Sequence, residues 1–149
     1  MRKHLLSIVA ALGLALMATN TWADTPHQVT GKGSSIDYQG RGVSLQFKAN
    51  IDMFGNVYGE ILQTTKVSGG GLKYHGVVLS FQLLDPHTAV FAGMIDSSND
   101  PAHPAGTFFE VKVVDGSPDQ YGFGFTNFPD CNDVNVTMRN LLRGSISVR

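Results

Sequence analysis

The sequence predicts an all-β protein: an antiparallel β-sandwich or a flattened barrel of about seven to nine strands, in a single domain. Three observations lead to this prediction. Apolar and polar residues alternate with period two along most of the chain, and turn-forming residues separate these runs at fairly regular spacing. No apolar spacing of three and four persists over three helical turns, so no long helix is expected.

The clearest strand covers residues 43–51. Successive side chains of a strand point to opposite faces, so its alternation gives one buried face and one wet face. The turn 52–56 follows, with Gly55 able to take positive φ, and 57–66 returns as the second arm of a hairpin. Gly59 within that arm indicates a bulge or a close backbone approach. The predicted buried face carries Val43, Leu45, Phe47, Ala49 and Ile51, and the wet face carries Ser44, Gln46, Lys48 and Asn50.

The middle of the chain predicts two more strands. Residues 72–84 alternate, and 85–88 has the composition of a turn. Residues 89–95 are almost wholly apolar, as expected of a central strand, and 96–106 forms the longest polar loop. In the strand 72–84, one face is predicted to carry His75, Val77, Leu79, Phe81 and Leu83.

The C-terminal third continues the pattern. Residues 107–115 and 121–125 predict two strands joined by a turn, and the loop 127–133 follows. Residues 134–142 fit either a strand or a short helix, and 144–149 closes the chain as a strand. On the strand 107–115, Glu110 falls on the wet face, where a carboxylate is ordinarily just solvated. The predicted core, buried between two sheet faces, includes Phe47, Leu79, Phe81, Phe91, Phe109, Val111 and Phe123.

The N-terminus predicts export. Residues 2–4 are basic, 5–18 are apolar and uncharged, and Ala23 supplies a small residue before a cleavage point. The apolar run is shorter than the roughly 20 residues that a membrane-spanning helix needs. We therefore expect residues 1–23 to be a signal peptide, and residues 24–149 to be the all-β domain of a secreted or periplasmic bacterial protein.

Charge excludes one class of partner. Once Arg2 and Lys3 leave with the signal peptide, nine basic residues face twelve acidic ones. No basic stripe or Lys/Arg cluster occurs, so nucleic-acid binding is not expected. The wet faces carry Lys and Gln, so the cleaved chain is not expected to span a membrane. The expected partner is an unknown envelope or extracellular protein or ligand.

Six short pieces of the chain, rich in glycine and aromatic residues, are considered together: GKGS (31–34), SLQFKANI (44–51), YHGV (74–77), AVFAGMI (89–95), FEVKVVDGSPDQYGF (109–123) and LRGSISV (142–148). In this order they resemble a family of bacterial exported domains named post-COAP-1. The resemblance runs along nearly the whole domain and implies an all-β exported module, without implying any catalytic residue.

Loop acids are the candidate binding residues. Asp115 and Asp119 lie in the stretch DGSPDQYGFGF, and a Ca²⁺ ion takes oxygen ligands of this kind. Asp96 and Asp100 of the other long loop would add to such a site. No continuous calcium-loop spacing occurs, however, and the favoured interpretation is a turn. In that interpretation Asp115 bonds its own backbone and Gly116 supplies positive φ, with no metal or cofactor bound.

No catalytic motif is visible, so we expect a protein that is not an enzyme. The four histidines beyond the signal peptide lack the pair spacing of a zinc site. No nucleophile elbow occurs, and nothing brings Glu60 and Glu110 together as a glycosidase would require. Those histidines are His27, His75, His87 and His103.

Cys131 is the only cysteine and cannot form a disulfide within the chain. It lies in a polar loop, where an exposed thiol in an oxidising compartment is open to pairing with a second molecule. The alternative is a single inert thiol.

Three function hypotheses follow. The first, which the sequence favours, is an exported non-catalytic binding or interaction module. The second is a carrier of small apolar ligands, with a cavity lined by Phe47, Phe81, Phe91 and Phe109. The third is a hydrolase with a site built from loop carboxylates, which needs two acids, or an acid and a His, to converge in a cleft. Under the binding-module hypothesis, the ligand can also be a sugar that stacks on Tyr38, Tyr58 or Tyr74.

Overall fold

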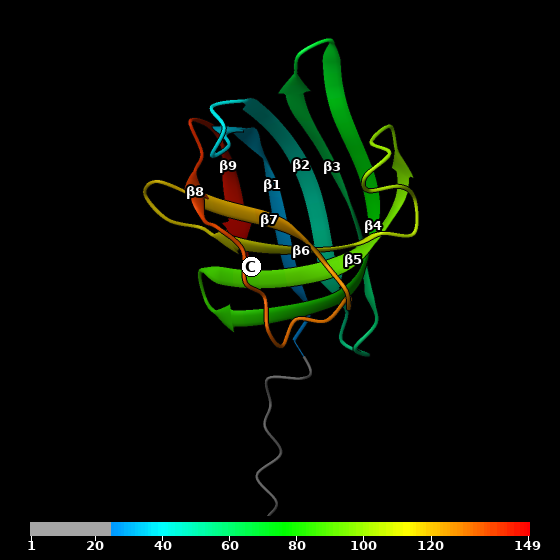
Figure 1. The fold of residues 1–149 in the computed structure, drawn as a ribbon. Helices are drawn as coiled ribbons and strands as arrows, with labels where there is room; N and C mark the ends of the chain where they lie inside the picture. The colour runs from blue at the N-terminus through cyan, green and yellow to red at the C-terminus, as the bar shows by residue number, and fades with distance from the viewer. Residues whose placement is uncertain (1–24) are drawn as a thin grey trace, which may run out of the picture.

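Nine antiparallel strands form one sheet in the computed structural model, which describes residues 25–149 (Figure 1). The strand order across the sheet is β8-β7-β6-β5-β4-β3-β2-β1-β9. No helix occurs within residues 25–149, and therefore none that is long and apolar enough to cross a membrane. The predicted signal peptide lies outside these residues. The strands are β1 (His27–Ile36), β2 (Gly42–Ile51), β3 (Val57–Val67), β4 (Gly70–Asp85), β5 (Thr88–Ser98), β6 (Phe108–Val114), β7 (Gln120–Thr126), β8 (Arg139–Asn140) and β9 (Arg143–Val148).

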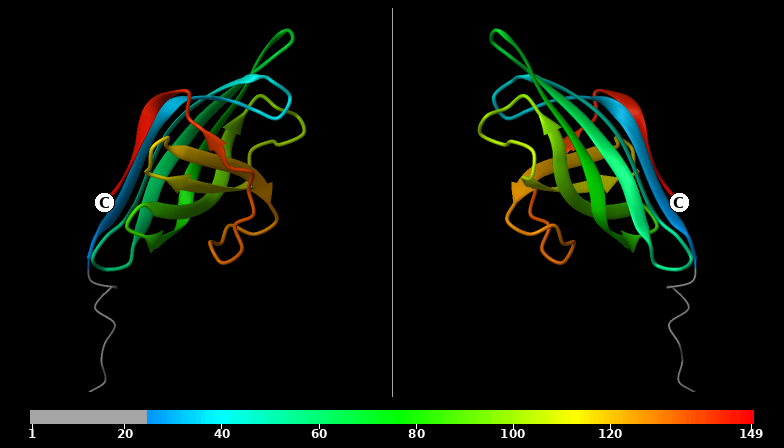
Figure 2. Two further views of the ribbon diagram at one scale, coloured as in Figure 1. Left: turned by 90° about the vertical axis from the view of Figure 1, so that its left-hand side faces the viewer. Right: turned by 90° about the vertical axis from the view of Figure 1, so that its right-hand side faces the viewer.

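The sheet curls so that its two halves pack on each other. Strands β5, β6 and β7 cross in front of β1, β2 and β3, and the turned views show the two groups as two sides of one fold (Figures 1 and 2). The long strand β4 pairs with both β3 and β5, so it belongs to both halves. The all-β prediction is confirmed, and both sides of the core come from one sheet.

The core fills the inside of the curl. Phe47, Phe91, Phe109 and Val111 are at most 3% exposed, as predicted, and Phe81 is 9% exposed. The remaining two predicted core residues are less buried than predicted. Phe123 is only half-buried against the core, and the prediction for Leu79 is wrong because that side chain is 49% exposed.

A β-bulge explains the position of Leu79. Val78 pairs with Gly93 and Ser80 pairs with Ala92, so Leu79 is an extra residue without a partner on β5. An inserted residue reverses the alternation of the strand beyond it. Tyr74 and Val78 therefore point inward before the bulge and Phe81 after it, and the single face predicted for residues 72–84 is wrong.

The central strand β5 is buried on both faces, as its apolar sequence predicts. Val90 and Ala92 on its outer face are at most 2% exposed. The segment 127–138 covers this face: the Ser80 hydroxyl donates to the Pro129 carbonyl at 2.9 Å. Only Arg139–Asn140 of the ambiguous segment 134–142 forms a strand, and β9 confirms the closing strand.

Glu110 corrects the prediction of a solvated carboxylate. It lies on the outer face of β6 beneath the same segment and is 8% exposed. The Asn135 amide donates to its Oε1 at 3.3 Å. Burial, reinforced by Asp133 and Asp130 nearby, raises the pKa of this carboxyl above its usual range.

Candidate functional site

Asp115 and Asp119 close the curl of the sheet. Strand β9 pairs with β1 on one side, and these two carboxylates bind its backbone from the other side. Asp119 Oδ2 accepts a hydrogen bond from the Ile146 amide at 2.7 Å, and Asp115 Oδ2 accepts one from the Val148 amide at 3.1 Å. The two acids thus stand where a neighbouring strand would supply carbonyl oxygens.

The local turn differs from the predicted one. Asp115 bonds β9 instead of its own backbone, and Asp119 Oδ1 accepts from the Gly116 amide at 2.9 Å. Gly116 is absent from the glycines with positive φ, so that part of the prediction is wrong. The stretch DGSPDQYGFGF does form a turn that leads into β7, because β7 begins at Gln120, and Tyr121 is buried in the core as predicted.

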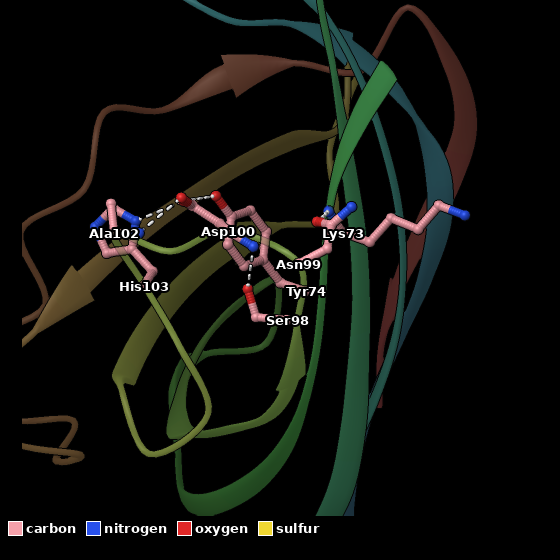
Figure 3. Close-up of polar contacts among 7 residues, drawn as sticks. All are labelled: Lys73, Tyr74, Ser98, Asn99, Asp100, Ala102 and His103. Carbon is pink, nitrogen blue, oxygen red and sulfur yellow. Dashed lines mark hydrogen bonds and ion pairs between the residues drawn. The ribbon is translucent and has the colours of Figure 1, made fainter. Parts of the chain in front are cut away.

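Asp100 holds the loop between β5 and β6 against the inside of the fold (Figure 3). Its Oδ2 accepts from the Tyr74 hydroxyl at 2.5 Å and lies 2.9 Å from His103 Nδ1, while its Oδ1 accepts from the Ala102 amide at 2.9 Å. The bond from Tyr74, followed by that from His103, lowers the pKa of Asp100 to about 2. Burial raises the pKa of the Tyr74 hydroxyl well above its usual range.

Asp96 lies on β5, although the sequence places it in a loop. A bulge between His75 and Gly76 leaves it unpaired opposite β4. Its Oδ1 is 2.5 Å from His75 Nδ1, and Glu60 Oε2 is 3.4 Å from His75 Nε2. The bond from Asp96, with Glu60 adding to it, raises the pKa of His75. All three side chains are at least 37% exposed on the outer face.

The four candidate acids therefore do not converge. Asp115 and Asp119 lie beside β9, Asp100 lies in the loop between β5 and β6, and Asp96 lies on the outer face. Within residues 25–149, no group of three or more His, Cys, Asp or Glu side chains is arranged to hold a metal ion. Two of these acids do meet a histidine: Asp96 lies beside His75 on the exposed surface, and Asp100 lies beside His103 in the loop between β5 and β6.

The most apolar opening lies at one end of the curled sheet. It has a volume of about 880 Å³, within the range of about 300–1,000 Å³ usual for small-molecule sites. We call it the end pocket. It lies where β1 begins and where β2, β4 and β9 end. Its lining consists of His27, Ile51, Phe81, Leu83, Leu84, Asp85, Pro86 and Arg149.

Arg149 stands at this opening in a fixed backbone position. Its amide donates to the Gln28 carbonyl, and its own carbonyl accepts from the Gln28 amide, both at 2.9 Å. Its Nε donates to the Ser147 hydroxyl at 3.2 Å, and no side-chain carboxylate of residues 25–149 forms an ion pair with it. Asp85, the acid at the same opening, accepts from the His87 amide at 2.8 Å, and this bond is the main cause of its lowered pKa.

The sequence predicted a different cavity. Phe81 does line the end pocket, but Phe91 and Phe109 are fully buried in the core, and Phe47 packs on Phe91 with ring centroids 5.4 Å apart. Sequence reasoning missed Leu84 and Arg149. The consecutive Leu83 and Leu84 before a turn are a usable signal, because two adjacent apolar residues interrupt the alternation.

Two further candidates have definite positions. Tyr38 and Tyr58 are 79% and 54% exposed, whereas Tyr74 is buried and cannot stack on a sugar. Cys131 is half-buried, with its Sγ 3.2 Å from the Ser80 hydroxyl, and burial raises the pKa of its thiol. The intermolecular disulfide stays a prediction.

No family model matches this chain, and comparison with curated proteins and with solved structures finds no match.

Proposed function

We propose that the protein is an exported, non-catalytic module that binds a small amphipathic molecule in the end pocket. The observation that carries this proposal is the apolar opening of about 880 Å³, bordered by an arginine without a carboxylate partner among residues 25–149. The basic start and apolar run of residues 2–18 support export. This combines the first two hypotheses from the sequence: a binding module whose ligand is a small molecule.

The lining indicates the ligand's chemistry. Phe81, Leu83 and Leu84 offer apolar surface to the body of the ligand, whose burial contributes about 25 cal/mol per Å². Arg149 offers guanidinium N–H donors to an anionic head group at the rim. We therefore expect a ligand with an apolar body and a single carboxylate or sulfonate.

Two considerations support a role without catalysis. The loop carboxylates Asp115 and Asp119 are occupied by backbone amides, and Asp100 is occupied by Tyr74 and His103. The pairing of Asp96 with His75 satisfies part of the criterion for the hydrolase hypothesis, but their exposure on an open face provides none of the water exclusion that active sites use.

The test uses two fluorescent probes, neutral N-phenyl-1-naphthylamine and anionic 1-anilinonaphthalene-8-sulfonate. Both should bind the purified protein at one site. Leu84→Glu should weaken both at least tenfold because it introduces a charge into the apolar lining. Leu79→Glu is the matched control, since the two leucines lie on the same strand and are 47% and 49% exposed.

Arg149→Gln then tests the head group. It should weaken the sulfonate probe about tenfold and leave the neutral probe within twofold, because only the former has an anion to pair with Arg149. Equal weakening by the two leucine variants, or no saturable binding of either probe, would exclude the end pocket as a ligand site.

A further inference from the structure

The outer face of β9, β1, β2 and β3 carries two adjoining grooves, of about 550 and 350 Å³. Both are lined by Lys32, Gln46 and Ser145, so they form one continuous depression, which we call the outer groove. It lies on the opposite face of the sheet from the core. Its other lining residues include Ser44, Lys48, Leu62, Thr64 and Arg143.

The strand register arranges three cations of this groove in a diagonal row. Lys48 of β2 is opposite Thr30 of β1. Lys32 is two residues further along β1, and Arg143 of β9 is opposite Ser34, two residues further again. Each step moves two residues along and one strand across, which separates neighbouring positions by about 8 Å at ordinary strand spacing.

The row is accessible and unneutralised. Lys48, Lys32 and Arg143 are all exposed, and no carboxylate of residues 25–149 lies within ion-pair distance of them. Glu60 is directly opposite Lys48, but its carboxylate pairs with His75 at 3.4 Å and forms no ion pair with Lys48. Three like charges in a row, none of them in an ion pair within residues 25–149, favour an anionic ligand that extends across the strands.

The surroundings of the row favour a sugar chain. Ser44, Gln46 and Ser145 present hydroxyl and amide groups along the floor, which suits a ligand rich in hydroxyls. Tyr58 continues the same diagonal on β3, because it is opposite Asn50, which in turn is opposite Gln28. Its ring is 54% exposed and can stack on a pyranose face.

We propose that the outer groove binds an acidic polysaccharide, with its carboxylates on the row Lys48–Lys32–Arg143 and one sugar ring on Tyr58. Nucleic acid and polyphosphate are poorer fits. Duplex DNA carries one charge per about 1.7 Å, and three cations on a chain of net charge −1 neutralise little of such a ligand. In a polyuronate the charges are separated by sugar rings, and the hydroxyls meet the polar floor.

The experiment measures binding of a hexamer of galacturonic acid by isothermal titration calorimetry. The hexamer should bind, and the same hexamer with its carboxyls methyl-esterified should bind at least tenfold more weakly, because the ester keeps the sugar and removes the charge. Long-chain polyphosphate should also bind at least tenfold more weakly than the acidic hexamer, when the dissociation constants are compared per binding site. Binding of the ester or of polyphosphate as tight as that of the acid would overturn the proposal.

Variants locate the site. Lys32→Gln with Lys48→Gln should weaken hexamer binding at least tenfold, whereas Lys66→Gln with Lys112→Gln, which removes the same charge outside the row, should stay within twofold. Tyr58→Ala should weaken the esterified and acidic hexamers by the same factor. Unchanged melting temperatures would show that the variants fold. Equal weakening by the two lysine pairs would show that hexamer binding depends only on net charge, and it would refute the outer groove as the binding site.

Discussion

The two ends of the curled sheet differ, although β4 contributes side chains to both. At one end, which we call the closed end, the loop 99–107 folds over the interior. Asp100 fixes this loop to Tyr74 of β4 and also bonds His103 within the loop. The His103 ring stacks on Phe125 with centroids 3.6 Å apart, which completes the cover. At the other end only short connections follow the strands, and the end pocket stays open.

Loop length therefore decides which end can admit a ligand. The connection between β4 and β5 at the end pocket is only two residues long, Pro86 and His87, which cannot reach across the opening. The turn 52–56 is also tight, since Asp52 Oδ1 accepts from the amides of Phe54 and Asn56 at 2.8 and 2.9 Å. An interior with one covered end and one uncovered end is accessible from one side.

The largest expected effect compares one phenylalanine from each region. Phe109→Ala should cost about 3–5 kcal/mol of unfolding free energy, because it leaves an enclosed void among fully buried side chains. Phe81→Ala should cost about half as much, since the space that it vacates joins the open end pocket. Urea unfolding measures both. Equal losses would mean that the end pocket is not open in solution.

The next largest effect tests the seam beside the end pocket. Asp119→Ala removes the acceptor for the Ile146 and Gly116 amides and should cost about 2–3 kcal/mol, the usual contribution of hydrogen bonds to a charged group. Asp130→Ala is the control: its carboxylate is exposed, and within residues 25–149 it accepts only from the nearby Asn132 amide at 3.1 Å. A loss no larger than that of the control would show that β9 does not depend on Asp119.

The closed end should respond to pH. The pKa of Asp100 falls from 3.8 to about 2 on folding, so its ionised form stabilises the folded state. This stabilisation, about 2 kcal/mol, is fully present above about pH 4 and is lost as the pH falls toward 2. Asp100→Asn should therefore lower the unfolding free energy at pH 7 and have much less effect at pH 2. A constant difference across that range would contradict the role of the ionised carboxylate.

Hydrophobic alternation was sufficient to predict most strands, but it missed β1 (His27–Ile36) and it also failed where the chain departs from a regular ladder. The alternation of Val43, Leu45 and Phe47 is correct because β2 pairs without interruption. The prediction that Leu79 is buried is wrong because nothing in an apolar run indicates which residue a bulge will exclude from pairing. The prediction that Glu110 is solvated is wrong because its burial depends on a segment 25 residues away in sequence.

The candidate sites were harder to predict for a related reason. The sequence singles out Asp115 and Asp119 as candidates, but their partners Ile146 and Val148 are brought near only by the closure of the sheet. The row of cations in the outer groove depends on the register between strands, and a one-residue shift would disperse it. Arg149 carries no local signal, because its position at the end pocket depends on the pairing of β9 with β1.

The smallest expected effect is that of calcium, which should leave the melting temperature unchanged. A cation needs free oxygen lone pairs, but Asp119 directs its two oxygens at the amides of Gly116 and Ile146, and Asp115 directs one at Val148. These N–H donors present their positive ends where the ion would have to sit. A Ca²⁺ site filled at 100 times its dissociation constant would add about 2.7 kcal/mol to stability, and a melt with calcium compared against one with chelator would detect that readily. A calcium-dependent rise that Asp115→Asn abolishes would show that the two carboxylates can leave β9 for the ion, and the seam would then be a metal site and not a fixed closure.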